Sequence, residues 1–211
     1  MFGREKLNKV FAEFTGTLLL ALSVLVVSHM FGLGTAAWYI SLTAGVALML
    51  IVAKLGHVSG AHVNPAVTIG LWTIKKINSN NAVVYIASQM LGGAVALLFY
   101  NYLINGSLAP SGSGEFVWRV FWGEAAGAII FGAGIASAID QKMEGFYKAF
   151  TIGASLAAGA LLASVASAGY LNPAVALANN SWDKTLVVAP IFGIIVGMNS
   201  YMALFASKKK K

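Results

Sequence analysis

The tripeptide Asn-Pro-Ala occurs once in each half of this chain, between two long apolar runs, and no other feature constrains the fold more. Its two copies are Asn64, Pro65, Ala66 and Asn172, Pro173, Ala174. Asparagine is a favoured helix N-cap, because its side-chain oxygen accepts a backbone N–H of the first turn. Proline suits the next position, where no N–H is needed. Each tripeptide therefore predicts the start of a helix.

The helix predicted after the first tripeptide is too short to cross a bilayer. It would cover the 12 residues 65–76, which is ~18 Å at ~1.5 Å per residue, against a hydrocarbon core ~30 Å thick. A helix that starts at membrane depth must have its open end buried in protein or facing a water-filled cavity. Two such half-helices, one in each half, are typical of a site at the bilayer midplane between inverted repeats.

The composition predicts a multi-pass integral membrane protein. Hydrophobic residues make up 58% of the chain and charged residues 10%, and the mean hydropathy is +0.78, which excludes an ordinary soluble domain. Six runs are long enough to span a bilayer, and they are 10–30, 37–55, 82–104, 116–139, 149–168 and 185–206. The first run is too long for a removable signal peptide. We expect one compact domain, 1–211.

The net charge of +7 is distributed unevenly across the predicted membrane. If the six runs alternate in direction, only Arg119 and Lys184 fall on one side. The remaining basic residues fall on the other: Arg4, Lys6, Lys9, Lys54, Lys75, Lys76, Lys142, Lys148 and the lysines at 208–211. This bias predicts that both termini are cytoplasmic and argues against a nucleic-acid partner. The 208–211 run either contacts anionic lipid or forms a solvated tail. The short tails favour a prokaryotic cell membrane.

The two halves repeat each other in opposite orientations. The Glu-x-x-Gly sequence at Glu13 returns at Glu124, and each half then reads as span, span, half-helix, span. Because three spans per half reverse the direction of the second half, we expect an inverted repeat of about 1–104 and 116–211. The linker, 105–115, is rich in Gly, Ser and Pro, which is typical of an exposed loop.

Glu13 and Glu124 are ionisable residues inside predicted spans, and such residues are either functional or paired. Their equivalent positions favour a structural role, in which each carboxylate accepts backbone N–H groups of a half-helix loop. A proton relay is the alternative.

The segment 56–68, Gly-His-Val-Ser-Gly-Ala-His-Val-Asn-Pro-Ala-Val-Thr, resembles the first signature loop of the aquaporin family, the major intrinsic proteins, and 171–174 is similar to the second. The resemblance covers nearly the whole chain. It implies an all-α membrane protein with six transmembrane helices plus two re-entrant half-helices in an inverted repeat. It also implies a homotetramer with one pore per subunit that conducts water or small neutral solutes passively.

The resemblance assigns roles to the residues of the two loops. The side-chain amides of Asn64 and Asn172 would donate hydrogen bonds to a passing solute, and the positive half-helix ends, ~+0.5 charge each, would oppose cations. Backbone carbonyls would form the accepting side of the pathway, and they belong to His62, Val63, Tyr170 and Leu171.

The chain departs from the family pattern at the outer selectivity filter. Most members carry an arginine directly after the second Asn-Pro-Ala, where this chain has Val175. The other three filter positions correspond to Ala44, Ala160 and Gly169. Without an arginine, a histidine or an aromatic ring, the filter is predicted to be wide and apolar, weakly selective, and open to glycerol, urea or larger polyols.

Several alternatives stay open at this point. The apolar walls could dewet and conduct poorly, or the linker at 111–114 could fold in and close the space. A closed protein with a structural membrane role fits the same filter. An ion-conducting variant is disfavoured because no ring of acids lies in the predicted spans.

Enzymatic and metal chemistry is not indicated. The chain has no cysteine, which excludes disulfides and thiolate ligands. His57 and His62 lie in a loop with no third ligand nearby, so we expect no metal site. No catalytic residue and no cofactor is expected.

Overall fold

The computed structural model describes residues 3–31, 33–112 and 114–206, and these form eight helices. The helices are α1 (Arg4–Phe31), α2 (Leu33–Ser59), α3 (Pro65–Thr73), α4 (Ser79–Leu103), α5 (Trp118–Asp140), α6 (Gly145–Ala163), α7 (Pro173–Ala178) and α8 (Lys184–Leu204). Six of them are long and apolar enough to cross a membrane. The all-α architecture with six spans and two short helices is therefore confirmed.

Two helices end at least three residues earlier than the sequence pattern predicts. α6 ends at Ala163 rather than 168, because the next residues turn and Ser167 points its hydroxyl at a buried carboxylate instead of continuing the helix. α3 ends at Thr73, and Lys75 adopts a left-handed φ of 59° that a helix cannot accommodate.

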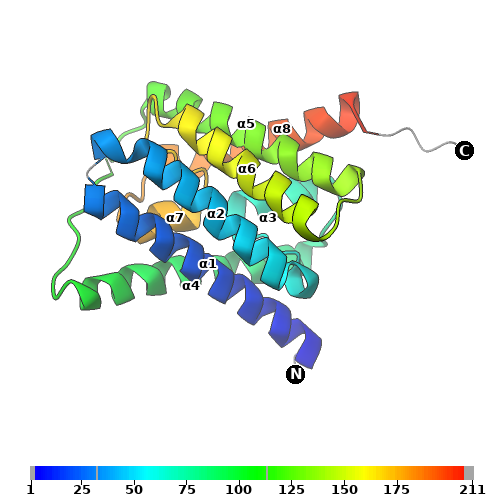
Figure 1. Cartoon of the computed structure of the whole chain (residues 1–211), viewed down its shortest axis with the longest axis horizontal. Coiled ribbons are helices and arrows are strands. Elements are labelled where there is room, and N and C mark those ends of the chain that lie inside the picture. The colour runs from blue at the N-terminus through cyan, green and yellow to red at the C-terminus, as the bar shows by residue number, and fades with distance from the viewer. Residues whose placement is uncertain (1–2, 32, 113, 207–211) are drawn as a thin grey trace, which may run out of the picture.

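The long helices surround the two short ones, as Figure 1 shows. α3 packs on α8 and α4, and α7 packs on α4, α1 and α8. The pairs of long helices repeat between the halves: α1 contacts α2 and α4, and α5 contacts α6 and α8. α2 and α6 contact each other across the two halves. This arrangement brings the N-termini of both short helices to the middle of the bundle.

Glycines allow the long helices to approach at backbone distance. A Cβ on Gly45 would meet the carbonyl of Gly153, and a Cβ on Gly153 would meet that of Gly45. Gly127 of α5 and Gly159 of α6 oppose each other in the same reciprocal way. Because lipid removes the hydrophobic drive between helices, such close packing is what stabilises a membrane bundle.

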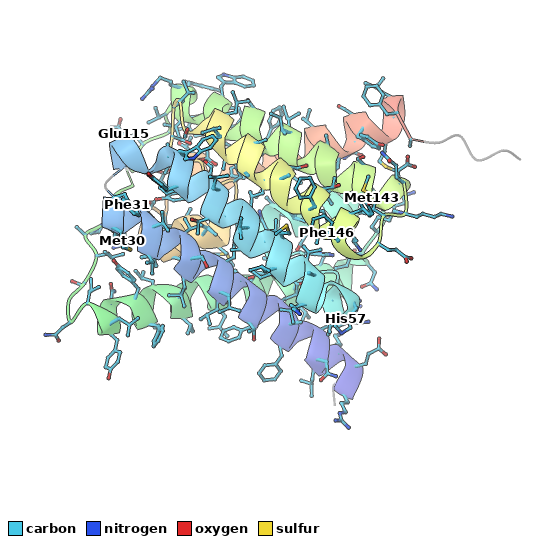
Figure 2. The ribbon with its side chains drawn as sticks, viewed as in Figure 1. Met30, Phe31, His57, Glu115, Met143 and Phe146 are labelled. Atoms are coloured by element: carbon cyan, nitrogen blue, oxygen red, sulfur yellow. The ribbon has the colours of Figure 1, made fainter. Side chains whose placement is uncertain are left out.

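The two ends of the bundle carry different connections. Figure 2 places His57, Met143 and Phe146 at one end, which we call the inner end, and Met30, Phe31 and Glu115 at the other, the outer end. α1 begins and α8 ends at the inner end (Figure 1). The lysines at 208–211 lie outside the described residues.

Candidate functional site

The two short helices begin in the same way. Asn64 has extended backbone angles, φ −159° and ψ 120°, and its Oδ1 accepts the N–H of Ala66 at 2.8 Å. Asn172, at φ −153° and ψ 112°, accepts the N–H of Ala174 at 3.0 Å. In both cases proline occupies the first helical position. The two asparagines therefore act as N-caps, and each side chain is oriented by its own helix.

The same asparagines connect the two halves. The Nδ2 of Asn64 donates to the carbonyl of Leu171 at 2.9 Å, and the Nδ2 of Asn172 donates to the carbonyl of Val63 at 3.0 Å. A side-chain amide has two N–H donors, so one donor of each asparagine remains. Two of the four carbonyls expected along the pathway thus have a structural partner, and each keeps one lone pair.

A fully buried carboxylate accepts hydrogen bonds from the backbone of each loop. Glu13 accepts hydrogen bonds from His62 N at 3.0 Å, Val63 N at 2.7 Å, Ser59 Oγ at 2.7 Å and Gln89 Nε2 at 2.7 Å. Glu124 accepts them from Tyr170 N at 3.0 Å, Leu171 N at 2.8 Å and Ser167 Oγ at 2.6 Å. Both residues have no exposed surface. These donors satisfy the carboxylate oxygens, because a buried carboxylate without hydrogen-bond partners would be strongly destabilising.

The loops are held in a strained conformation. Ala61, Val63 and Leu171 have left-handed φ values of 49°, 42° and 50°. Such a value is unusual for a β-branched residue, and strain of this kind persists where the surroundings over-determine it. The N–H of Val63 and the N–H of Leu171 are among the groups that the buried carboxylates bind. The carboxylates therefore fix the direction of the carbonyls and side chains around the asparagines.

Asn64 and Asn172 face a narrow cavity, which we call the waist. The space open to the centres of water molecules there is about 10 Å³, room for about one water. The other residues that line it are His62, Val63, Tyr170, Ala44, Val175, Leu20, Val24, Leu48, Phe131 and Leu156. The two asparagines are 2% exposed. The waist can thus present an amide donor from each half to a single small molecule.

The four residues of the expected filter separate into two pairs. Ala44 and Val175 line the waist. Gly169 instead packs against Ala160, because a Cβ on Gly169 would meet the carbonyl oxygen of Ala160 at 2.5 Å. Gly169 has a φ of 68°, which favours glycine.

Four bulky residues of the waist were missed by the sequence analysis. They are Leu20, Phe131, Leu48 and Leu156. Once one residue of a pair is known to line the waist, the repeat indicates the other. Leu20 and Phe131 each lie seven residues after the buried glutamate of their half, and Leu48 and Leu156 each lie sixteen residues before the asparagine.

Two larger cavities share lining residues with the waist. The inner cavity, about 270 Å³, is lined by His62, Lys76 and Lys148 together with apolar residues of α2, α3, α5 and α6. The outer cavity, about 240 Å³, is lined by Tyr170, Ser181 and residues of the linker, α5 and α8. His62 also lines a polar cleft of about 570 Å³ that includes His57, between α1 and α4. Within the described residues, no three His, Asp or Glu side chains gather as metal ligands.

Comparison with known proteins agrees with this geometry. The family model described as "Major intrinsic protein" matches residues 3–201. Aquaporin Z of Photorhabdus laumondii is 30% identical, over 96% of this chain and 100% of that protein. Aquaporin AqpM of Methanothermobacter thermautotrophicus is 29% identical, over 81% of this chain and 78% of its own length.

A solved structure shares the fold. The X-ray structure of the aquaglyceroporin from Plasmodium falciparum superimposes with a TM-score of 0.69, at 20% identity, over 96% of each chain. At that identity the likeness concerns the fold alone, whereas the family model covers nearly the whole sequence. This chain belongs to the major intrinsic protein family.

Proposed function

We propose that this membrane channel for water and small solutes conducts them passively through the waist, and that it admits neutral solutes as large as glycerol. The observation that carries the proposal is the pair of asparagine amides at the waist. Each is fixed by its N-cap bond and by a carbonyl of the other half, and each retains one N–H donor. A solute that accepts hydrogen bonds finds donors there that are already oriented.

The same arrangement supports exclusion of cations. The N-termini of α3 and α7 both lie at the waist, and a helix N-terminus carries a partial positive charge. Among the described residues that line the waist, none has an acidic side chain. A cation entering from either end would lose water and meet two positive helix ends, which is an electrostatic barrier of the kind that channels use.

The proposal that glycerol passes rests on the filter positions. Ala44 and Val175 present small apolar side chains to the waist. The other two filter positions, Ala160 and Gly169, have no side-chain hydrogen-bond donor and no charge. The inner cavity of about 270 Å³ combines apolar walls with Lys76 and Lys148. Such a mixed lining suits a molecule with a carbon backbone and hydroxyl groups.

A second candidate is a closed protein that has the fold but conducts poorly. The narrowness of the waist favours it, since Leu20, Leu48, Phe131 and Leu156 leave room for about one water. An apolar constriction of that width can dewet and thereby stop conduction. A structural role in the membrane would then be the function.

Orientation and assembly are part of the proposal. The beginning of α1 and the end of α8 share the inner end (Figure 1), and so do the connections that carry Lys142 and Lys75. Because basic residues favour the cytoplasm, we place the inner end and both termini there. We further propose that 1–104 and 116–211 are inverted repeats, and that the chain assembles as a homotetramer.

Stopped-flow light scattering on proteoliposomes tests the function. Vesicles that contain the wild-type protein are challenged with an impermeant sugar, then with glycerol, urea and a five-carbon polyol, and are compared with protein-free vesicles. Rapid shrinkage in the sugar, followed by re-swelling in glycerol, is the expected result. Water flux without glycerol flux would reject the wide filter, and no flux of any solute would favour the closed candidate.

A further inference from the structure

We propose that the side chain of Tyr170 sets the size limit for solutes at the outer end of the waist, and that Ser181 holds it in place. This inference rests on the proposed function, because a size limit has meaning only for a conducting pore. The four small filter residues do not restrict solute size, and we assign that restriction to the tyrosine side chain.

Tyr170 lies between two cavities of very different size. It lines the waist, which has room for about one water, and it also lines the outer cavity of about 240 Å³. It is the residue that these two linings share, and it is only 8% exposed. Because Tyr170 belongs to both linings, it is the residue through which the outer cavity adjoins the waist.

The two ends of the Tyr170 residue are fixed independently. Its backbone N–H is bound by Glu124 at 3.0 Å, and its hydroxyl is hydrogen-bonded to the hydroxyl of Ser181 at 3.3 Å. Ser181 in turn is hydrogen-bonded to Ser111 of the linker. The backbone N–H of Ser111 donates to the carbonyl of Asn180 at 2.9 Å. The position of the ring is thus coupled to the linker and to the segment after α7.

The repeat supports a role for the side chain in addition to its carbonyl. His62 stands two residues before Asn64, as Tyr170 stands two residues before Asn172. His62 lines the waist and the inner cavity, and Tyr170 lines the waist and the outer cavity. The two residues therefore flank the waist from opposite ends, each with a ring and a polar atom.

The filter residues around Tyr170 cannot supply the same bulk. Ala44 and Val175 are small, and Gly169 has no side chain. The tyrosine ring is a large group next to these small residues, and a substitution can remove it. Shortening it should widen the pathway for a solute larger than water while it leaves the asparagine donors unchanged.

The test compares permeability ratios in proteoliposomes. We expect Tyr170→Ala to raise the ratio of glycerol to water permeability by about tenfold, equivalent to about 1.4 kcal/mol in the relative barrier. Tyr170→Phe keeps the ring and should stay near the wild-type ratio. Tyr147→Ala is the matched control, because Tyr147 is 75% exposed and lines none of these cavities. Size-exclusion chromatography checks folding, and Tyr170→Leu replaces the alanine variant if that variant aggregates.

A cysteine variant adds a reversible test, because the chain contains no other cysteine. Tyr170→Cys should conduct glycerol faster than the wild type, and attachment of a bulky methanethiosulfonate reagent should reduce that flux until a reducing agent removes it. Tyr147→Cys, labelled to the same extent by mass spectrometry, should show no change.

The outcomes separate this inference from the proposed function. If the wild type conducts water and glycerol and Tyr170→Ala has an unchanged ratio, the inference is wrong and the function stands. If the wild type is silent and Tyr170→Ala conducts, Tyr170 closes the pore and the open-channel function is wrong. If neither protein conducts, both proposals are rejected.

Discussion

The loops that precede α3 and α7 have one backbone design and two different side-chain surroundings. In each, a serine five residues before the asparagine donates to the buried glutamate and accepts an N–H two residues on, as Ser59 and Ser167 do. The residue directly before the asparagine is left-handed in both, at φ 42° for Val63 and 50° for Leu171. The scaffold of the site is therefore duplicated between the halves.

The two loops differ in what fixes the ring two residues before the asparagine. The Nδ1 of His62 is hydrogen-bonded to Thr68 at 3.2 Å, and its ring packs edge-on against Tyr85 with centroids 5.1 Å apart. Gln89 joins this network by donating to Thr68 at 2.9 Å and to Glu13. All of these partners lie on helices or at their ends.

Among the described residues, the outer loop has a different set of polar contacts. At the same distances from Asn172, the places of Thr68 and Gln89 are taken by Ala176 and Gly197. Tyr170 relies instead on Ser181, which follows α7 in a non-helical segment. The comparison teaches that the two loops share a scaffold, while the ring of His62 is fixed by residues of the helices and the ring of Tyr170 by residues of loops. Loop contacts are the easier of the two to change, and the size limit that we propose at Tyr170 depends on them.

The largest expected effect is loss of a buried glutamate. Glu13→Leu leaves four donors without their acceptor and Glu124→Leu leaves three, at about 1–3 kcal/mol for each buried donor left unsatisfied. We expect both variants to lose folded protein, and Glu13→Leu to lose more. The stability of each variant is measured by heating it in detergent and recording the loss of the folded peak in size-exclusion chromatography. Equal stabilities would contradict the difference between the two loops.

The next effect concerns the residue three before each asparagine. Gly169→Ala places a Cβ against the carbonyl oxygen of Ala160 at a φ of 68°, and we expect it to cost about 1–3 kcal/mol of stability through local strain. Ala61→Gly is the matched change in the inner loop, where alanine already occupies a φ of 49°. It should change stability by less than about 1 kcal/mol. A well-folded Gly169→Ala would show that the outer loop can shift.

Val175→Arg restores the residue that most family members carry, and we expect it to lower glycerol permeability by about tenfold, or about 1.4 kcal/mol in the barrier. The side chain at this position lines the waist, so a longer cationic group narrows it and adds donors. Val175→Leu controls for bulk without charge, and Val67→Arg places the same group at the equivalent position of α3. If Val67→Arg lowers glycerol flux as much as Val175→Arg does, the outer end has no special role in selection.

Much of the scaffold is predictable from sequence, because local chemistry determines it. The N-caps at Asn64 and Asn172 follow from the tripeptides, and the six spans follow from hydropathy. The cross-bonds from Asn64 to Leu171 and from Asn172 to Val63 are not predictable in this way, since they join residues 107 and 109 positions apart.

The width of the site is the part that sequence predicts least well. Small residues at Ala44 and Val175 indicate space, but they do not show which neighbour fills it. Phe131 of α5 and Leu156 of α6 line the waist although neither is a filter position. The placement of Tyr170 depends on the left-handed residues on either side of it, Gly169 and Leu171. The backbone conformation of this loop is decided by tertiary contacts, such as the hydrogen bonds from Tyr170 and Leu171 to the carboxylate of Glu124.

The smallest effect tests the loop anchor directly. Ser181→Ala removes one hydroxyl bond from Tyr170, worth about 0.5–1.5 kcal/mol, and should raise the glycerol-to-water ratio two- to threefold because the ring gains freedom. Ser181→Thr keeps the hydroxyl and should stay near the wild type. Thr68→Val removes the corresponding bond from His62, yet His62 keeps its contact with Tyr85, so its effect on the ratio should be smaller. If Thr68→Val changes the glycerol-to-water ratio more than Ser181→Ala does, the comparison is reversed. Permeability would then depend more on the position of the His62 ring than on that of the Tyr170 ring, and the size limit would lie at His62.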